Sequence, residues 1–471
     1  MAEQVESIKW IPNTRFLVDG FRFQSPRCSS YFLTHMHGDH YCGLTKSFGA
    51  GHLEAVIYCS KITAALLTHD FGLPPRRVRA LPMDQPVSID GVRVTLIDAN
   101  HCPGAVMFFF DFSHRTAKVS PEAILHTGDM RWHARMGQHP ALCGRRIDLL
   151  LMDTTYGAPK HVHPPQEEAV ALIVDTMRKE VAARPRTLFV VGSYRIGKER
   201  AYLGAARAMG WRVFCNADKR KVLGLLDLPA ADMALVTGDK KAARVHVVAM
   251  GQAQMSPEAL TSRCTAAGYS HVVGFRPTGW TFRKSGGLEV RREGCATIYG
   301  VPYSEHSNFE ELRDCVRTLH PSRLVPTVNA ANMTASRAMV DKFADLMDLR
   351  KDRSRLDHYL RPAATAPPAS ERQGSDHPTA LRGGDPPAAQ LPHSRSAPLT
   401  GDCGSAGGAS EAMVLADVDL VEQQRLQPAV KPEMAAAQPR KWAKAAPAAP
   451  CGSSKRRQLT LGSFFGKGAQ R

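Results

Sequence analysis

Short apolar runs alternate with segments of helical periodicity through about the first 350 residues of the chain. Strands are predicted from the runs at 15–19, 56–59, 92–97, 105–110, 123–125, 147–152 and 323–328. The run 105–110 reads AVMFFF without polar alternation, which is typical of a strand covered on both faces. Strands separated by helices predict layers of α-helix and β-sheet.

The middle of the chain has a strand and helix order of its own. Periodicity predicts helices at 166–179 and 197–209, with a strand at 187–191 between them and another at 271–274. This βαβ-like order indicates an inserted α/β domain. The strand at 296–299 is expected to return the chain to the first domain.

Two helices outside the insertion have N-terminal capping residues. Ser60 precedes the helix predicted at 61–69, and Ser307 or Asn308 precedes the one at 309–319. Serine and asparagine side chains accept hydrogen bonds from the first amides of a helix, which have no partner inside it. We therefore expect both helices to begin at these positions.

Composition changes in the second part of the chain, where Pro, Ala, Gly and Ser dominate from Arg361 to about Ser454 and aromatic residues are few. Such a segment cannot bury enough apolar surface to offset the entropy of ordering. The predicted segments are 1–156 and 298–350 for the first domain, 157–297 for the inserted domain, 351–454 for a disordered linker and 455–471 for a basic tail.

The chain carries 61 basic and 44 acidic residues, a formal net charge of +17. This excess favours a polyanion as partner, through counterion release, without identifying it. Its 11 cysteines include no CxxC pair, and it has neither a signal peptide nor an apolar run of about 18 residues. We expect a protein without a membrane segment in a reducing compartment.

Residues 34–40 read THMHGDH and follow the apolar run 31–33 directly. Imidazoles two residues apart can turn toward one divalent ion, at about 2.0–2.1 Å for zinc, while a following carboxylate and a further imidazole face a second ion about 3.5–4 Å away. Catalytic zinc needs more ligands than one loop supplies. His101 and Asp129 each follow a predicted strand and are the candidates.

These residues carry a family resemblance. The blocks are FLTH at 32–35, DANHCPG at 98–104, DTTY at 153–156, FRPTGW at 275–280 and PYSEHS at 302–307. Together with the histidine motif they resemble the sensitive-to-nitrogen-mustard family of DNA cross-link repair nucleases, relatives of Artemis and Apollo in the β-CASP branch of the metallo-β-lactamase superfamily. The match runs from about residue 8 to about 348. It implies an α/β fold, the αββα metallo-β-lactamase sandwich with an inserted β-CASP domain.

The resemblance also implies roles for the site residues. We expect one ion on His35, His37 and His101, with Asp129 bridging to a second ion on Asp39 and His40. Zinc is the expected metal, as one or two ions, with magnesium or manganese possible at the second position. Relatives that process RNA have a further histidine where this chain has Val328, so valine favours DNA and leaves single occupancy open.

Further residues match outer and catalytic positions of the family. Asp19 is expected to orient the metal loop, and Asp153 and His306 occupy the first two β-CASP positions beside the metals. With Asp39 they form the predicted catalytic set. Cys102 adjoins a proposed ligand and is expected to be a small packing residue, and His133 is not expected to be a ligand.

A glycine-bearing turn separates the strand and helix of the inserted domain. Ser193, Tyr194, Gly197 and Lys198 lie there, and many such turns contain Gly and Lys without any ligand. The resemblance implies recognition of a 5′-phosphorylated DNA end at this place, with Arg276 as a further phosphate contact. Trp280 is expected either to stack on a base or to pack the domain interface.

The basic tail contains the sequence QLTLGSFF at 458–465, which resembles the peptide that docks on the PCNA sliding clamp. One helical turn places Leu461, Phe464 and Phe465 on one face, while Gln458 caps from the side. The basic residues 455–457 serve as part of a nuclear import signal, as attraction to the clamp, or only as a solvated charge run.

The sequence therefore predicts a nuclear, monomeric, metal-dependent DNA nuclease. Its expected reaction is 5′-to-3′ exonuclease cleavage that requires a 5′-phosphate, in interstrand cross-link repair at the sliding clamp. The alternatives are an endonuclease of the Artemis kind, a hydrolase of small β-lactam-like substrates, and a clamp-bound scaffold whose metal site has decayed.

Overall fold

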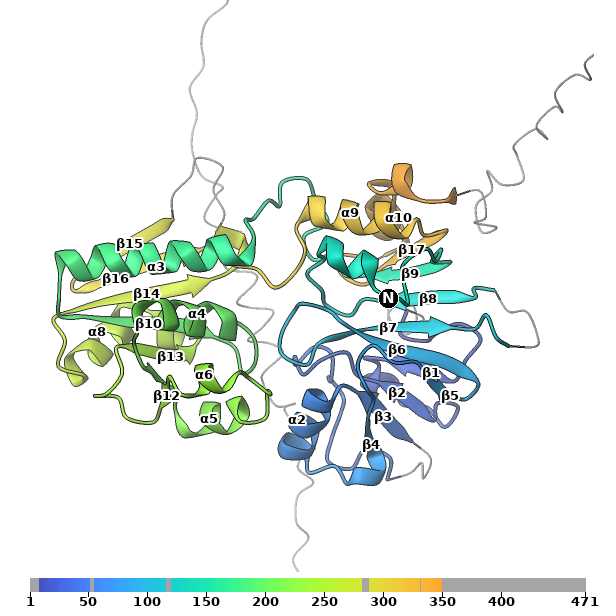
Figure 1. The fold of residues 1–471 in the computed structure, drawn as a ribbon, viewed down its shortest axis with the longest axis horizontal. Coiled ribbons are helices and arrows are strands. Elements are labelled where there is room, and N and C mark those ends of the chain that lie inside the picture. Colours follow the sequence, from blue (N-terminus) through green and yellow to red (C-terminus); the bar gives the residue numbers. More distant parts are fainter. Residues whose placement is uncertain (1–7, 51–54, 116–119, 282–287, 331, 350–471) are drawn as a thin grey trace, which may run out of the picture. The chain divides into compact units, whose positions relative to one another are not determined.

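The computed structural model describes residues 8–50, 55–115, 120–281, 288–330 and 332–349. The predicted linker, the basic tail and the clamp-docking peptide lie outside these ranges. Figure 1 shows the elements in sequence colours.

The first part of the chain, before the insertion, consists mainly of short strands. Its elements are β1 (Phe16–Val18), η1 (Phe21–Phe23), β2 (Ser30–Phe32), β3 (Val56–Cys59), α2 (Lys61–Phe71), η2 (Pro75–Arg77), β4 (Val78–Ala80), β5 (Val87–Ile89), β6 (Val92–Asp98), β7 (Val106–Asp111), β8 (Ala123–His126), η3 (Ala134–Gln138) and β9 (Leu149–Met152).

The insertion alternates strands and helices, and the last described part of the chain contains two α-helices, a strand and a short 3₁₀ helix. The insertion contains α3 (Gln166–Ala183), β10 (Thr187–Ser193), α4 (Glu199–Met209), β11 (Val213–Phe214), α5 (Ala217–Leu223), α6 (Ala230–Met233), β12 (Val236–Thr237), β13 (Val245–Ala249), α7 (Gln252–Met255), α8 (Pro257–Ala266), β14 (His271–Pro277), η4 (Gly279–Thr281), β15 (Glu289–Glu293) and β16 (Ala296–Val301). The last part contains α9 (Phe309–Leu319), β17 (Arg323–Pro326), α10 (Met333–Asp341) and η5 (Ala344–Leu346).

Two sheets form the first domain. One has the order β1-β2-β3-β4, with all neighbours parallel. The other has the order β17-β9-β8-β7-β6-β5, antiparallel from β5 to β8 and parallel from β8 to β17. The carboxyl ends of β6, β8 and β9 consequently lie at the same edge of the second sheet.

The apolar runs are buried on both faces because alternate side chains enter different cores. In β7, Phe108 and Phe110 belong to a core with Phe16 and Phe32 of the facing sheet. Their neighbour Phe109 points the other way, into the core that includes the helices. The sequence AVMFFF lacks polar alternation for this reason.

Helices cover the outer faces of the two sheets. Helix α2 lies against β4, and its Leu66 and Leu67 are buried in the core. Helix α9 buries Leu312 and Val316 beside the strands of the other sheet (Figure 1). The αββα sandwich expected from the resemblance is therefore confirmed.

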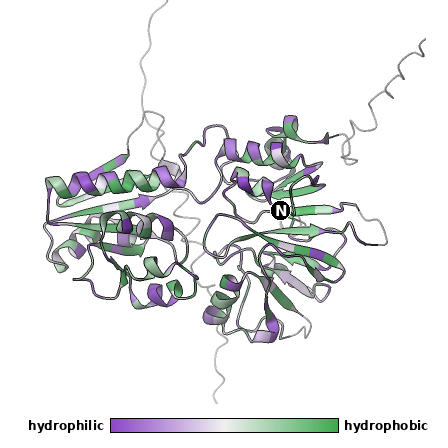
Figure 2. Ribbon diagram, viewed as in Figure 1, coloured by the Kyte–Doolittle hydropathy of each residue, from purple (hydrophilic) through white to green (hydrophobic). Residues whose placement is uncertain are grey.

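A seven-stranded sheet forms the inserted domain, in the order β12-β11-β13-β10-β14-β16-β15. All neighbours are parallel except β15 and β16. Helices α3 and α4 pack on one face and α7 and α8 on the other, and the strands between them are mostly apolar in Figure 2.

The prediction for the strand at 296–299 was wrong about its sheet. This strand, β16, pairs with β14 and β15 inside the inserted sheet, so the boundary expected at 297 cuts through it. The chain returns to the first domain only after Val301. Its apolar run fits either sheet equally well, because strand patterning does not identify the neighbouring strand.

The other predicted helices and strands are confirmed, with ends that differ by a few residues. The Ser60 side chain accepts a hydrogen bond from the amide of Thr63 and caps α2. Of the two candidates before α9, Asn308 is the cap, in a reciprocal pair with Glu311. No helix within the described ranges is long and apolar enough to cross a membrane.

Substituting Phe110 tests the core between the two sheets. This side chain is fully buried and its ring contacts three other phenylalanines, so Phe110→Ala should cost about 3–5 kcal/mol through lost burial and the cavity left behind. Guanidinium unfolding followed by fluorescence should show a lower midpoint. Phe110→Leu is the control and should lose less, and equal midpoints for Phe110→Ala and wild type would contradict the packing.

Candidate metal centre

The predicted ligands lie at the ends of strands along one edge of the sandwich. Four of them follow β2, namely His35, His37, Asp39 and His40. His101 follows β6, Asp129 follows β8 and Asp153 follows β9, whereas His306 lies between β16 and α9. Chain segments far apart in sequence therefore meet here, because the carboxyl ends of these strands share an edge.

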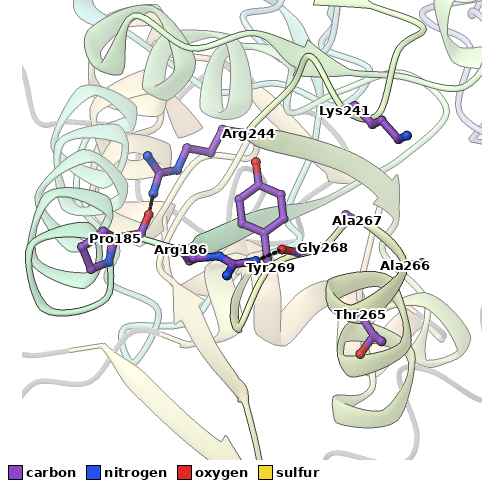
Figure 3. A pocket seen from close by; sticks show the side chains of 9 residues that line it. All are labelled: Pro185, Arg186, Lys241, Arg244, Thr265, Ala266, Ala267, Gly268 and Tyr269. Atoms are coloured by element: carbon purple, nitrogen blue, oxygen red, sulfur yellow. Dashed lines mark hydrogen bonds between the residues drawn. The ribbon is translucent and has the colours of Figure 1, made fainter.

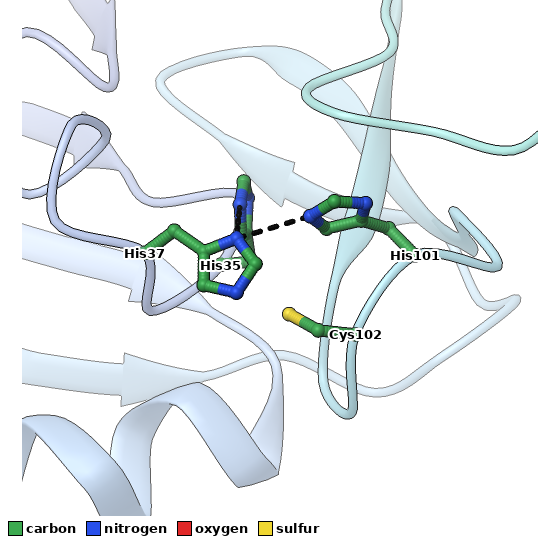
Figure 4. A group of neighbouring side chains, drawn as sticks. All are labelled: His35, His37, His101 and Cys102. Carbon is green, nitrogen blue, oxygen red and sulfur yellow. Dashed lines mark hydrogen bonds between the residues drawn. The ribbon is translucent and has the colours of Figure 1, made fainter. Parts of the chain in front are cut away.

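Three imidazole nitrogens converge on one point (Figure 4). Nδ1 of His37 lies 3.0 Å from Nε2 of His35 and 3.0 Å from Nε2 of His101. Nitrogens around a tetrahedral zinc ion lie about 3.3 Å apart when each is about 2.0–2.1 Å from the metal. The three atoms thus have nearly the spacing of ligands to a single ion.

The other ring nitrogens identify the tautomers of two of these histidines. His37 Nε2 lies 3.1 Å from the carbonyl oxygen of Ile196, and His101 Nδ1 lies 2.8 Å from that of Glu305. A carbonyl oxygen only accepts, so each of these nitrogens carries the proton. The converging nitrogens of both rings therefore present lone pairs to each other.

The third ring is oriented through a hydroxyl group and a carboxylate. His35 Nδ1 lies 3.0 Å from Thr34 Oγ1, which donates its own proton to Asp19 Oδ2 at 2.8 Å. The hydroxyl oxygen therefore accepts from His35 Nδ1, and Nε2 of this ring also presents a lone pair. Asp19 is an outer partner of the kind that ligating histidines use.

Three buried lone pairs that face one another repel unless a cation lies between them. Burial, together with the neighbouring imidazoles, lowers the pKa of His35 and of His101 well below the usual value, so the rings do not relieve the repulsion by protonation. The donor set suits a divalent ion that accepts nitrogen ligands, and His35, His37 and His101 would hold it.

A second group of donors adjoins the first. Asp129 Oδ2 lies 3.1 Å from His40 Nε2 and 3.7 Å from His35 Nε2, between the two sets of nitrogens. His40 Nδ1 donates to Asp19 Oδ2 at 2.7 Å. Burial lowers the pKa of His40, but Asp129, Asp19 and Asp39 outweigh it and raise this pKa well above its usual value.

Asp39 lies at the rim of the centre rather than inside it. Its side chain is 52% exposed, and Oδ2 is 3.6 Å from His40 Nε2. Asp39 does not belong to the close groups of donor atoms found among the described residues. Two of these groups are His35 with His40 and Asp129, and His101 with Asp129 and His306. Its carboxylate is therefore placed to meet incoming substrate or solvent as well as an ion.

Asp153 and His306 form a hydrogen-bonded pair beside the three imidazoles. His306 Nδ1 lies 2.8 Å from Asp153 Oδ2, and its ring centroid is 4.7 Å from that of His101. Burial lowers the pKa of His306, but the charge of Asp153 and the hydrogen bond raise it to about 9. The pair leaves Nε2 of His306 as the nitrogen available to another molecule.

Cys102 also points toward the histidines (Figure 4). Its sulfur lies within 4.8 Å of the donor nitrogens of His35, His37 and His101, so it has the position of a fourth donor. Burial raises the pKa of its thiol well above the usual value. His133, by contrast, is exposed, and its Nδ1 accepts from the amide of Arg135.

The turn expected to bind phosphate lies next to the metal centre, but two of its amides already have carboxylate partners. The amide of Gly197 donates to Glu199 Oε2 at 2.7 Å, and that of Lys198 donates to Glu305 Oε1 at 2.6 Å. Gly197 has φ +102°, and a Cβ there would lie 2.9 Å from Glu305 Oε2. The glycine thus allows this close approach of the two domains.

Side chains of the turn remain near the centre. The ring of Tyr194 is 6.2 Å from that of His37, and the ammonium group of Lys198 lies 4.6 Å from the centre of the Tyr194 ring. The Ser193 hydroxyl is buried and donates to the carbonyl oxygen of Gly197 at 3.0 Å. A phosphate here would therefore not be bound by the amides of Gly197 and Lys198, which leaves these side chains as candidate contacts.

Arg276 lies on β14, which runs parallel to β10, with Phe275 opposite Val191. Its segment and the turn after Ser193 therefore end at the same edge of the inserted sheet. The half-buried Arg276 has no hydrogen-bond partner at Nε among the described residues.

Several residues of the centre were missed by the sequence reasoning. Thr34 and Glu305 adjoin predicted ligands but had no separate signal. Arg131, which is buried, donates to the carbonyl oxygens of Ser304 and Pro164 and so ties the loop after Asp129 to the loop of His306. Only the folded chain brings these partners together.

A separate basic pocket of about 560 Å³ lies at the amino ends of β10, β13 and β14, away from the metal centre. Arg186, Lys241 and Arg244 line it, and its lining includes no acidic side chain from the described part of the chain. Arg244 donates to the carbonyl oxygen of Pro185 and Arg186 to that of Gly268, as Figure 3 shows. These contacts direct both guanidinium groups toward the backbone.

Comparison with known proteins identifies the family of the chain. Residues 22–183 match the beta-lactamase superfamily domain, and residues 230–332 match the DNA repair metallo-beta-lactamase family. Over 343 residues the chain is 39% identical to the DNA cross-link repair protein SNM1 of Arabidopsis thaliana, covering 72% of this chain and 69% of that one. The chain belongs to the SNM1 family of DNA cross-link repair proteins. The family resemblance read from the sequence is thereby confirmed.

Other SNM1 relatives are longer. The DNA cross-link repair 1A protein of Gallus gallus is 38% identical over 350 residues, which are 73% of this chain but 35% of that protein. The 5′ exonuclease Apollo of Gallus gallus is 33% identical over 331 residues, 69% of this chain and 64% of Apollo. The chain thus spans about a third of the former relative and about two thirds of the latter. The metallo-β-lactamase fold of the SNM1 family implies divalent metal binding.

Asp19→Asn tests whether this carboxylate organises the centre. The change weakens the acceptor for Thr34 and His40, so the affinity for zinc should fall about 10–100-fold, as for other outer partners of metal ligands. Competition with a chromophoric chelator measures the affinity. Asp90→Asn is the matched control, since Asp90 has φ 47° and Asp19 has φ 49°, a region that asparagine tolerates. Equal affinities of both variants would contradict the role of Asp19.

Proposed function

We propose that this SNM1-family chain is a metal-dependent nuclease that hydrolyses phosphodiester bonds in DNA. The convergence of three imidazole lone pairs beside the Asp153–His306 pair carries the proposal. The names of the relatives, which include a 5′ exonuclease and cross-link repair proteins, support DNA as the substrate.

Zinc is the ion that we propose for His35, His37 and His101. Asp129 would bridge this ion to a second metal position, which His40 and Asp39 would serve. The second position would take zinc, magnesium or manganese, or remain unused, because Val328 stands where RNA-processing relatives have a further histidine. A divalent ion in such a site lowers the pKa of a water molecule toward about 7 and withdraws charge from phosphate oxygens.

The residues of the chain supply orientation and proton transfer. Asp19 fixes the rings of His35, through Thr34, and of His40. Asp153 accepts from Nδ1 of His306 and holds that ring, so Nε2 is the atom that donates a proton to a phosphate oxygen or to the leaving oxygen. Asp39, half exposed at the rim, completes the proposed catalytic set.

Cleavage from a 5′-phosphorylated end is the finer form of the proposal. The Tyr194 ring lies 6.2 Å from that of His37, and the Lys198 ammonium group lies over the Tyr194 ring. Ser193 belongs to the same turn, and Arg276 lies at the same edge of the inserted sheet. Cationic side chains here favour a terminal phosphate by charge, even though the amides of Gly197 and Lys198 donate to carboxylates.

The biological setting is also a proposal. We infer action in interstrand cross-link repair in the nucleus, with recruitment by the PCNA sliding clamp through Gln458, Leu461, Phe464 and Phe465, which lie outside the described residues. Such a peptide gains affinity from an apolar helical face in a groove.

A set of end-labelled single strands tests the reaction. With a 5′-phosphate, wild type should release nucleotides from the 5′ end, and a 5′-hydroxyl should slow the reaction about tenfold or more because a charged contact is lost. Asp39→Ala should abolish cleavage while thermal unfolding stays unchanged. Equal rates on both ends, with cleavage of hairpin DNA, would indicate an endonuclease of the Artemis kind instead.

The docking peptide is tested by titrating the full chain against the sliding clamp in a calorimeter. Joint Phe464→Ala and Phe465→Ala substitution should weaken binding at least about tenfold, since paired aromatic anchors carry much of such an interface. Leu459→Ala is the matched control within the same peptide and should bind like wild type. Undiminished binding of the double variant would refute docking by these residues.

A further inference from the structure

Trp280 forms an open aromatic surface at the junction of the two domains. The residue is 52% exposed, whereas Tyr156 next to it is 4% exposed. Their ring centroids are 5.0 Å apart, and the ring of His161 meets the indole edge-on at 5.3 Å. A tryptophan that only packs an interface would bury most of its surface. Here the tyrosine is buried and the indole is presented to solvent.

This surface is connected to the metal centre by ring contacts. The Tyr156 ring is 6.1 Å from that of His306, which is 4.7 Å from that of His101. The backbone of a stacked strand advances about 3.4 Å per nucleotide. The indole therefore lies within reach of the first few nucleotides of a strand whose phosphate is at His306.

A tight turn holds the indole in place. A Cβ on Gly279 would lie 2.5 Å from the Tyr156 hydroxyl oxygen and 3.2 Å from Cβ of Ser304, so only glycine allows this approach. The amide of Thr278 donates to the carbonyl oxygen of Val301 at 2.9 Å. The platform is thus formed before any ligand arrives, which reduces the entropy cost of binding.

We propose that Trp280 is a stacking platform for an unpaired nucleobase within the first few nucleotides of the substrate strand. The inference rests on the proposed nuclease function and adds a substrate class to it. A base can lie flat on the indole only when it has left its own stack and pair, so the platform selects single-stranded or frayed ends. Stacking on an aromatic ring accepts every base, so the platform would bind its nucleotide without sequence preference.

Abasic substrates test the stacking directly. Single strands with a 5′-phosphate and one abasic nucleotide at the first, second or third position are compared with the intact strand. For wild type, an abasic nucleotide at one of these three positions should lower kcat/KM about tenfold, which is the loss expected for one stacked base. Trp280→Ala should show that loss on intact DNA and no further loss on the abasic strand, and Trp280→Phe should keep part of the effect.

A structural role of Trp280 would give a different pattern. Leu172→Ala, an exposed apolar change on α3, is the control and should respond to the abasic strands like wild type. If Trp280→Ala loses the same further factor on each abasic strand as wild type does, the stacking proposal is overturned, while the nuclease function stands.

A binding measurement separates this inference from the proposed function. If wild type cleaves DNA, a strand with 2-aminopurine at the sensitive position is bound to the inactive Asp39→Ala chain. If wild type cleaves no DNA, strands with 2-aminopurine at each of the three positions are bound to wild type. Stacking on the indole should quench the emission, and adding Trp280→Ala should restore it. Equal emission with and without Trp280 overturns the platform, whereas absent cleavage with Trp280-dependent quenching overturns only the nuclease function.

Discussion

The mutual repulsion of three buried lone pairs is the constraint on which the centre depends. His37 and His101 donate their protons to carbonyl oxygens, and His35 donates its proton to a hydroxyl group, so the remaining nitrogens face one another at hydrogen-bond distance without a hydrogen. A cation between these nitrogens would relieve their repulsion. The sandwich supplies the rigidity that holds it, because each ligand follows a strand whose position is determined by two apolar cores.

The inserted domain takes part in this centre. The carbonyl oxygen of Ile196 orients His37, and the amide of Lys198 donates to the buried Glu305 in the loop that leads to His306. A change at the contact between the domains would therefore alter the ligand geometry. This coupling explains why glycine occupies position 197, where a side chain would separate the two surfaces.

Two buried carboxylate–histidine pairs flank the centre and have different tasks. Asp19 and His40 belong to the support of the metal loop. Burial raises the pKa of Asp19, but the charge of His40 and the hydrogen bond with it help to lower this pKa to about 2. Asp153 and His306 lie on the side where Tyr156 leads to the open indole of Trp280. One side of the centre is thus closed by supporting hydrogen bonds, and the other leads to an exposed aromatic ring.

Local patterns in the sequence determined most elements, the cap at Ser60, and the set of metal-binding candidates, because periodicity, capping and ligand chemistry depend on neighbouring residues. The partner sheet of β16 and the carboxylates that occupy the amides of Gly197 and Lys198 were decided only by the tertiary structure. So were the roles of Thr34 and Arg131. Most of these contacts join residues far apart in the chain, and no local pattern specifies which distant group will meet a given strand end or amide.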